Sequence, residues 1–180
     1  MKGFSGEKIL VSLPALLILA WFSVASAASL YLVNNGARQL DIYDPVLYKK
    51  TGSITAGESP VKAALSPDGR LLAVTQKEFF GEWPDAVRIF DMQKGKVAAK
   101  VNIPLTRYRK RGDAFTVFSK DSKKIYTDET ETGFLNVIDT TGWRLVKKLA
   151  LGVHPLKPVL SPDGRRLYVP CLYSGAVAVV

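Results

Sequence analysis

A five-residue motif, Ser-Pro-Asp-Gly-Arg, occurs twice in this 180-residue chain, at residues 66–70 and 161–165. Each copy follows a Gly-x-x-Pro element, at 57–60 and 152–155, and in both cases the glycine precedes the serine by nine residues. Two markers in one relative register indicate an internal repeat, and a period of roughly 20–50 residues is typical of solenoids and propellers.

The length of the repeat follows from three aspartates that end short β-like stretches. A turn residue lies thirteen positions after each one, and the pairs are Asp44 and Gly57, Asp91 and Pro104, and Asp139 and Gly152. Nine residues separate glycine from serine, and 20 separate Ser119 from Asp139, so the repeat unit is 42 residues long.

The middle copy of the serine motif is degenerate and reads Ser119-Lys120-Asp121-Ser122-Lys123. It keeps the serine, the aspartate and a final basic residue. Aspartate and serine favour turns by bonding to nearby backbone amides, whereas glycine supplies positive φ. Because Ser122 replaces that glycine, we expect the middle turn to differ from the other two.

Each unit contains four short strand candidates, which in the first complete copy are 61–65, 70–75, 86–90 and 96–101. The last two alternate with the period of half-buried strands, and no segment after residue 28 has a helical period. Four strands in about 42 residues describe one propeller blade. The sequence therefore predicts an all-β fold, a partial β-propeller of about three to four four-stranded antiparallel blades.

The expected units are a partial blade at 28–60, blades at 61–104 and 113–152, and an incomplete blade at 156–180, with 14 strands in all. Closed propellers use about four to eight four-stranded blades, so we expect the chain to be a fragment. The alternative is a chain that closes by self-association, because bare sheet edges invite aggregation.

These motifs resemble the YVTN β-propeller repeat. The resemblance rests on Gly152-x-x-Pro155, on Ser161-Pro162-Asp163-Gly164-Arg165 and on the Leu167-Tyr168-Val169 that follows, and it covers about residues 28–180. It implies a propeller of the kind found in periplasmic and surface-layer proteins. Related repeats look like those of phosphogluconate-type lactonases, haem-carrying nitrite reductases and amine dehydrogenase subunits, so the resemblance implies a fold and no single activity.

Residues 1–27 read as a secretory signal, expected as an N-terminal helix. Lys2 and Lys8 flank the start of an apolar run at 9–20, and the small residues 25–27 form a cleavage site. The alternative is an uncleaved anchor, although the 17 residues from Ile9 to Ala25 are short for a span of about 20 apolar residues. In both cases the rest of the chain is exported, so we expect a periplasmic or extracellular location.

The chain is basic, with a formal net charge of +9. Such a charge favours anionic surfaces or partners, and in an exported protein it does not indicate nucleic acid. The single cysteine, Cys171, excludes an intramolecular disulfide. We expect a small buried residue at this position; the alternatives are a reactive thiol and an intermolecular bridge.

Two insertions break the period, with about five extra residues near 78–85 and six near 106–113. In an antiparallel meander both fall at the same end of one blade, and loops on a rigid scaffold are where binding is usually built. The candidates for binding an anion or a partner are Phe79, Phe80, Trp83, Arg107, Tyr108, Arg109, Lys110 and Arg111. Arginine suits bidentate recognition of carboxylate or phosphate. The competing interpretation is a solvated basic loop beside a hydrophobic plug over a sheet edge.

His154 is the only histidine and lies in a predicted interblade loop. It is a candidate metal or haem ligand or proton carrier, against the alternative of an exposed turn residue. With one histidine, no His-rich site forms within the chain, and no nucleophile motif is present. We therefore predict no catalytic residue, no metal site and no cofactor, and we expect the recurrent aspartates to cap turns.

The sequence favours an exported binding or scaffold module without chemistry of its own, with its ligand on the face that carries the insertions. The alternative is part of a propeller enzyme or redox subunit, either lactonase-like or belonging to a haem- or quinone-associated dehydrogenase or reductase. The expected partner is an anionic ligand or a protein, with a membrane surface as a further option.

Overall fold

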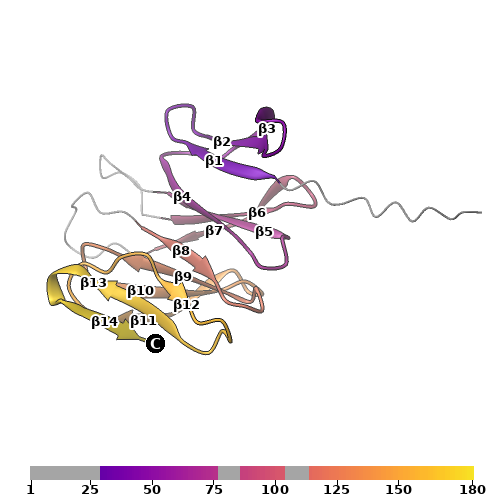
Figure 1. Cartoon of the computed structure of the whole chain (residues 1–180). Helices are drawn as coiled ribbons and strands as arrows, with labels where there is room; N and C mark the ends of the chain where they lie inside the picture. Colours follow the sequence, from indigo (N-terminus) through magenta and orange to yellow (C-terminus); the bar gives the residue numbers. More distant parts are fainter. Residues whose placement is uncertain (1–28, 77–85, 104–113) are drawn as a thin grey trace, which may run out of the picture.

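The computed structural model describes residues 29–76, 86–103 and 114–180, in which the chain forms four antiparallel sheets placed one beside the next (Figure 1). The first sheet contains β1 (Leu30–Asn34), β2 (Gln39–Asp44) and β3 (Lys49–Thr55). The second contains β4 (Pro60–Leu65), β5 (Leu71–Gln76), β6 (Ala86–Asp91) and β7 (Lys96–Asn102). The third contains β8 (Thr116–Phe118), β9 (Lys124–Glu129), β10 (Phe134–Asp139) and β11 (Arg144–Ala150). The fourth contains β12 (Val159–Leu160), β13 (Leu167–Cys171) and β14 (Ala176–Val179), with a 3-10 turn at Leu172–Ser174.

This arrangement confirms the predicted all-β fold and partial propeller. Neighbouring strands in each sheet are consecutive in the chain, which is the meander of a propeller blade. The strands of the second sheet begin and end within one residue of their predicted bounds. The expected signal helix at 1–27 lies outside the described residues. Within the part of the chain that the structure describes, no helix has the length and hydropathy needed to cross a bilayer.

Apolar side chains fill the space between successive sheets, because the alternation along each strand sends them to both faces. Between the first and second sheets lie Leu40, Ala56, Leu72, Val74 and Phe90. Between the second and third lie Ala73, Val87, Ile89, Val101, Ile103, Phe118, Ile125 and Ile138. Between the third and fourth lie Leu135, Leu167 and Val169. Burial of each large side chain is worth about 1.5–3 kcal/mol, so these layers hold the row of sheets together.

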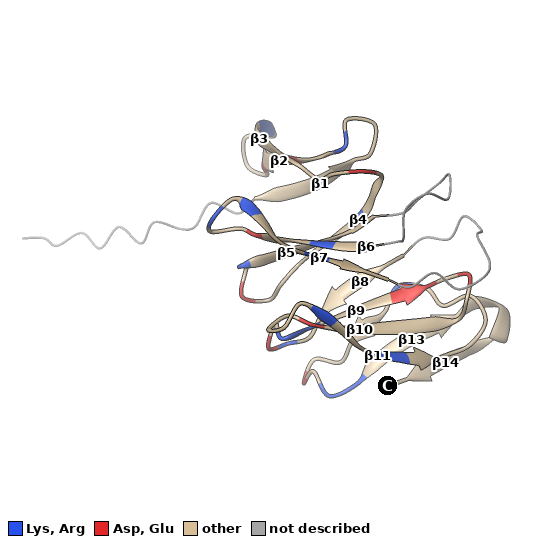
Figure 2. Cartoon of the chain, turned by 180° about the vertical axis from the view of Figure 1, so that it is seen from behind, with Lys and Arg blue, Asp and Glu red and all other residues tan. Residues whose placement is uncertain are grey.

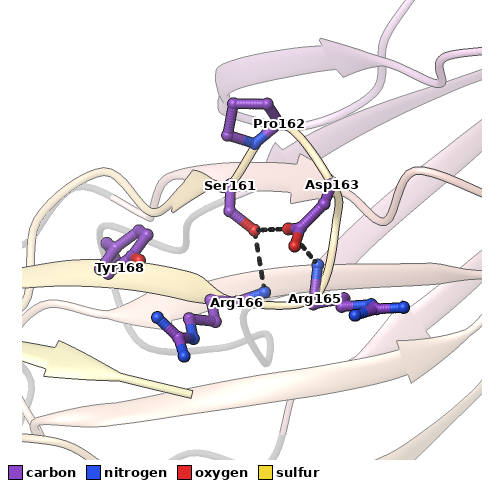
Figure 3. Close-up of a pocket in the computed structure, with 6 residues that line it drawn as sticks. All are labelled: Ser161, Pro162, Asp163, Arg165, Arg166 and Tyr168. Carbon is purple, nitrogen blue, oxygen red and sulfur yellow. Dashed lines mark hydrogen bonds between the residues drawn. The ribbon is translucent and has the colours of Figure 1, made fainter.

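A ring of hydrogen bonds closes the turn between the first and second strands of the fourth sheet (Figure 3). Ser161 Oγ donates to Asp163 Oδ1 at 2.5 Å and accepts the Arg166 N–H at 3.0 Å. The Arg165 N–H also donates to Asp163 Oδ1, at 3.0 Å. The same three bonds recur around Ser66 and around Ser119. The repeated serine motif is therefore a turn-building device.

The prediction that the middle turn differs is wrong. Ser122 adopts a φ of 59°, close to the 71° of Gly69 and the 77° of Gly164. Its N–H bonds to the Ser119 carbonyl, as the equivalent glycines do to their serines. The Ser122 hydroxyl is buried and accepts the N–H of Asp68 from the neighbouring turn at 3.4 Å, which compensates in part for the strained backbone.

The aspartates of these turns accept several hydrogen bonds each. The serine hydroxyl and then the backbone N–H donors lower the pKa values of Asp68, Asp121 and Asp163. The aspartates that end β2, β6 and β10 likewise accept N–H donors from the turns that follow them. The prediction that the recurrent aspartates cap turns is confirmed.

Each sheet has two ends, because successive strands run in opposite directions. The turn end consists of residues 44–49, 66–70, 91–96, 119–124, 139–144 and 161–166. The loop end consists of residues 34–39, 55–60, 129–134, 150–158 and 171–176, and the strands that flank residues 77–85 and 104–113 also reach it.

Candidate anion-binding site at the loop end of the second sheet

Both predicted insertions are attached at the loop end of the second sheet. Gln76, the last residue of β5, pairs with Ala86, the first of β6, and Ala86 pairs with Asn102, the last of β7. The two segments therefore start from adjacent strand ends. The predicted binding residues Phe79, Phe80, Trp83, Arg107, Tyr108, Arg109, Lys110 and Arg111 lie outside the described residues.

The chain enters the third sheet at Ala114 and Phe115. One of these residues is hydrogen-bonded to the second sheet and the other to the third sheet itself. Thr75 Oγ1 of β5 donates to the Ala114 carbonyl at 3.0 Å. The Phe115 N–H donates to Asp128 Oδ1 of β9 at 2.6 Å. The Lys62 ammonium lies 5.1 Å from the centre of the Phe115 ring. The return point of the second insertion is thus fixed to the scaffold.

Gln76 links the loop end of the second sheet to residues 55–60, which connect the first sheet to the second. Its buried Nε2 donates to the carbonyls of Ala56 at 3.1 Å and Glu58 at 2.9 Å, and its Oε1 accepts Nε–H of Arg88 at 3.2 Å. Gly57 has a φ of 90°, and a Cβ there would approach the Arg88 guanidinium and the Gln76 amide to 2.7 Å. The glycine of the Gly-x-x-Pro element therefore leaves the space that Arg88 occupies.

Arg88 stands at a position that is polar in the first three sheets, three residues before the aspartate that ends the strand. The equivalent residues are Asp41 and Asn136. In the first sheet the Lys50 ammonium bonds to Asp41 Oδ1 at 2.6 Å. This bond, followed by one from the Asn34 amide, lowers the pKa of Asp41. The first sheet therefore neutralises its cation.

The third sheet also neutralises its cation. Asn136 Nδ2 donates to Glu129 Oε1 at 2.7 Å, and the Lys148 ammonium contacts the two Glu129 oxygens at 2.8 and 3.0 Å. The same ammonium lies 4.6 Å over the Phe134 ring. Asn136 Oδ1 is buried, and within the described ranges no donor reaches it. Both carboxylate oxygens of Glu129 therefore have hydrogen-bond partners.

The second sheet departs from this pattern, because Arg88 and Lys100 are direct partners across β6 and β7. Residues directly opposite in a sheet share one face, and like charges there repel. Among the residues that the structure describes, no carboxylate forms an ion pair with either cation. Arg88 and Lys100 therefore form a positively charged site beside the strand ends from which both insertions start. Such a site suits a bound anion.

His154 lies at the loop end of the fourth sheet with a φ of 61°. Its carbonyl accepts the Leu172 N–H at 3.0 Å, and its half-buried ring lies 4.8 Å from that of Tyr173, tilted by 48°. In the described portion of the chain no three acidic, histidine or cysteine side chains are grouped to hold a metal. A ligand role for His154 stays a prediction. Cys171 is buried and unpaired, as expected.

Sequence reasoning missed Gln76, Arg88 and Lys100. Aligned repeats would have placed Arg88 beside Asp41 and Asn136, but they would not have found its partner. A β-bulge between Ile89 and Phe90 shifts the register, so Arg88 faces Lys100 where an unbroken ladder would present Ala99. The same irregularity recurs in the first and third sheets.

Comparison with known proteins supports the fold and leaves the activity open. No protein-family model matches the chain, and no curated protein matches it. Solved structures match it in 637 chains, so the architecture is widely shared and does not select one activity. One of them is Kuenenia stuttgartiensis hydrazine synthase, with a TM-score of 0.64 and 21% identity over 84% of this chain. The match covers 46% of that chain, and at this identity it shows the β-propeller fold alone.

Proposed function

We propose that this chain is an exported propeller module of the YVTN repeat type that binds an anionic ligand or partner at the loop end of the second sheet. The observation that carries the proposal is the facing pair of Arg88 and Lys100, where the neighbouring sheets have ion pairs. The sequence also predicts Arg107, Arg109, Lys110 and Arg111, which lie outside the described residues, as binding residues.

A carboxylate or phosphate group suits the geometry of this place. Gln76 and the Gly57 backbone hold the Arg88 guanidinium in position, so little conformational freedom is lost when a ligand binds. In the described part of the chain only Nε of Arg88 is bonded, which leaves its terminal nitrogens for two ligand oxygens. Exposed Lys100 supplies a second charge.

The test uses the variant pair Arg88→Met and Lys100→Met, which removes two charges and keeps an unbranched aliphatic stem at each position. The matched control is Lys147→Met with Lys157→Met, which removes two exposed cations, one from β11 and one from the connection before β12. On immobilised heparin we expect the first pair to elute at clearly lower salt than the control. Equal elution of the two pairs would show that net charge alone decides retention.

The predicted insertion residues are tested separately with the quadruple change of Arg107, Arg109, Lys110 and Arg111 to alanine. A variant that makes fewer contacts to heparin releases fewer counterions on binding. The salt dependence of its heparin binding should therefore be shallower. An unchanged salt dependence in a folded variant would remove these four residues from the site.

A second candidate function is a segment of a larger propeller enzyme or redox subunit. It follows from the resemblance of the repeat to those of propeller enzymes and redox subunits; one solved structure with the same fold, hydrazine synthase, is an enzyme by its name, and this chain covers 46% of it. In that case reacting groups would come from other parts of the assembly, with His154 as the candidate of this chain. Ligand binding that depends on His154 and not on Arg88 would favour this second function.

Export is also part of the proposal, because the first 27 residues have the pattern of a secretory signal. Cleavage after Ala27 leaves a mature chain that starts at Ala28. N-terminal sequencing of the protein recovered from outside the cytoplasm would test this. An intact Met1 on the exported protein would favour the anchor instead.

A further inference from the structure

Cations gather at the turn end of the molecule, opposite the proposed ligand site. The turn end holds ten lysines and arginines against six aspartates, whereas the described loop end holds Arg38 and Lys157 against three glutamates. The ten are Lys49, Arg70, Lys94, Lys96, Lys120, Lys123, Lys124, Arg144, Arg165 and Arg166, and all are exposed. Figure 2 shows cationic segments along the side of the molecule where these turns lie.

The six aspartates of the turn end are hydrogen-bonded within their own turns. Each accepts backbone N–H groups of the turn, with the bonds of 2.8 and 2.9 Å from Val46 and Leu47 to Asp44 as one example. Of the ten cations, only Lys94 forms an ion pair, with Asp91 at 3.3 Å, among the residues that the structure describes. The cations are therefore presented outward while the acids are engaged locally.

An apolar tip stands among these cations. The turn between β2 and β3 exposes Val46, Leu47 and Tyr48, with 79%, 64% and 86% of their surface accessible. The bonds to Asp44 fix the conformation of the tip, and Lys49 follows directly. An aliphatic pair beside a tyrosine and a lysine is the composition that enters the interface between lipid headgroups and acyl chains.

Two shallow hollows lie at the cationic turns of the third and fourth sheets. One, of about 420 Å³, is lined by Ser161, Pro162, Asp163, Arg165, Arg166 and Tyr168 (Figure 3). The other, of about 430 Å³, lies between the turns of the third and fourth sheets and is lined in part by Lys120, Lys124 and Tyr126, together with the turn-bonded carboxylates of Asp121 and Asp163. The Lys120 ammonium also donates to the Pro162 carbonyl at 2.9 Å, which links the two turns. Each hollow places an exposed cation beside a tyrosine.

The apolar N-terminal segment is joined to the molecule at the same end. Leu30, the first residue of β1, pairs with Tyr43, which lies one residue before the β2–β3 turn. The described chain therefore begins beside the apolar tip.

We propose that the turn end docks onto an anionic phospholipid bilayer, with Val46, Leu47 and Tyr48 in the headgroup layer and the surrounding cations on lipid phosphates. A soluble polyanion would use the cations equally well, but it would gain nothing from the apolar tip. The exposed apolar tip therefore favours a bilayer. This surface is separate from the Arg88 site and does not depend on it.

The first experiment measures binding of the full chain to vesicles of equal parts phosphatidylglycerol and phosphatidylcholine, and to vesicles of phosphatidylcholine alone. The test variant reverses Lys49, Lys123 and Arg165 to glutamate; the matched control reverses Arg38, Lys147 and Lys157, which are exposed and lie outside the turn end and outside the Arg88 site. We expect the turn-end variant to bind anionic vesicles about a hundredfold more weakly, and the control to change far less. Equal losses in the two variants would overturn the proposal, as would retention on heparin without vesicle binding.

The second experiment separates docking of this surface from insertion of the N-terminal segment. A fluorophore sensitive to polarity is attached at Tyr48→Cys or, as the control, at Lys157→Cys on the loop end; the native Cys171 is buried. Anionic vesicles should shift the emission of the probe at 48 to the blue and leave that at 157 unchanged. No shift at 48, or equal shifts at both positions, would show that the tip does not enter the membrane.

Discussion

Replacement of Ser119 by alanine tests the turn network in the middle of the row of sheets. Ser119 is 8% exposed, donates to Asp121 Oδ1 at 2.6 Å and accepts the Lys124 N–H at 2.9 Å. A bond to a charged group contributes about 1.5–3 kcal/mol and a neutral one about 0.5–1.5 kcal/mol. Asp121 and Lys124 are exposed, so water replaces part of both bonds. The expected loss in the free energy of unfolding is about 1–2 kcal/mol.

The assay is thermal unfolding followed by circular dichroism. For a chain of this size, about 1–2 kcal/mol lowers the Tm by roughly 2–8 °C. The control is Thr141→Ala, which removes one exposed hydroxyl that donates to Asp139 at 2.7 Å, and it should change the Tm by no more than about 2 °C. If Ser119→Ala leaves the Tm unchanged, or if Thr141→Ala lowers it by as much, the hydrogen bonds around Ser119 do not stabilise the turn.

Three further changes test the packing, the backbone and the titration of the turns. Ile89→Ala empties a fully buried position in the central layer and should cost about 2–5 kcal/mol, measured from the urea midpoint; a cost under about 1 kcal/mol would contradict the layered core. Gly133→Ala would place a Cβ 2.7 Å from the Gly152 carbonyl oxygen, whereas a Cβ at Gly69 meets nothing within 4 Å at a similar φ. Gly133→Ala should therefore lower the Tm more than Gly69→Ala. Equal effects of the two variants would refute the close contact. The pKa values of Asp68, Asp91, Asp121, Asp139 and Asp163 are lowered by their turn bonds, so the stability they contribute is present above about pH 4 and is lost as the pH falls through the folded values. Urea midpoints measured between pH 6 and pH 2 should decline only below about pH 4, and a flat profile would exclude this linkage.

The repeat made the architecture predictable because turn chemistry and strand alternation are local. The serine motif and the aspartates marked the ends of strands, so the bounds of the second sheet were within one residue of the structure. The turn at Ser122 was predicted wrongly, because its left-handed backbone is supported by contacts with the neighbouring turn that no local rule includes.

The charged features were harder to predict, because they depend on pairing across strands. A bulge determines that Arg88 faces Lys100, and the sequence of one strand does not reveal a bulge. Similarly, the ten cations of the turn end are scattered over six short segments and never form a run. Only the antiparallel topology brings them to one side.

The unequal layers between the sheets have a consequence for motion. Each sheet packs only on its neighbours, and the layer between the second and third sheets has eight buried side chains where that between the third and fourth has three. In such a row, local opening is favoured at the poorly packed margin. Amide protons of β13 and β14 should therefore exchange with solvent before those of β6 and β9. Local opening of the fourth sheet would then precede opening of the central sheets.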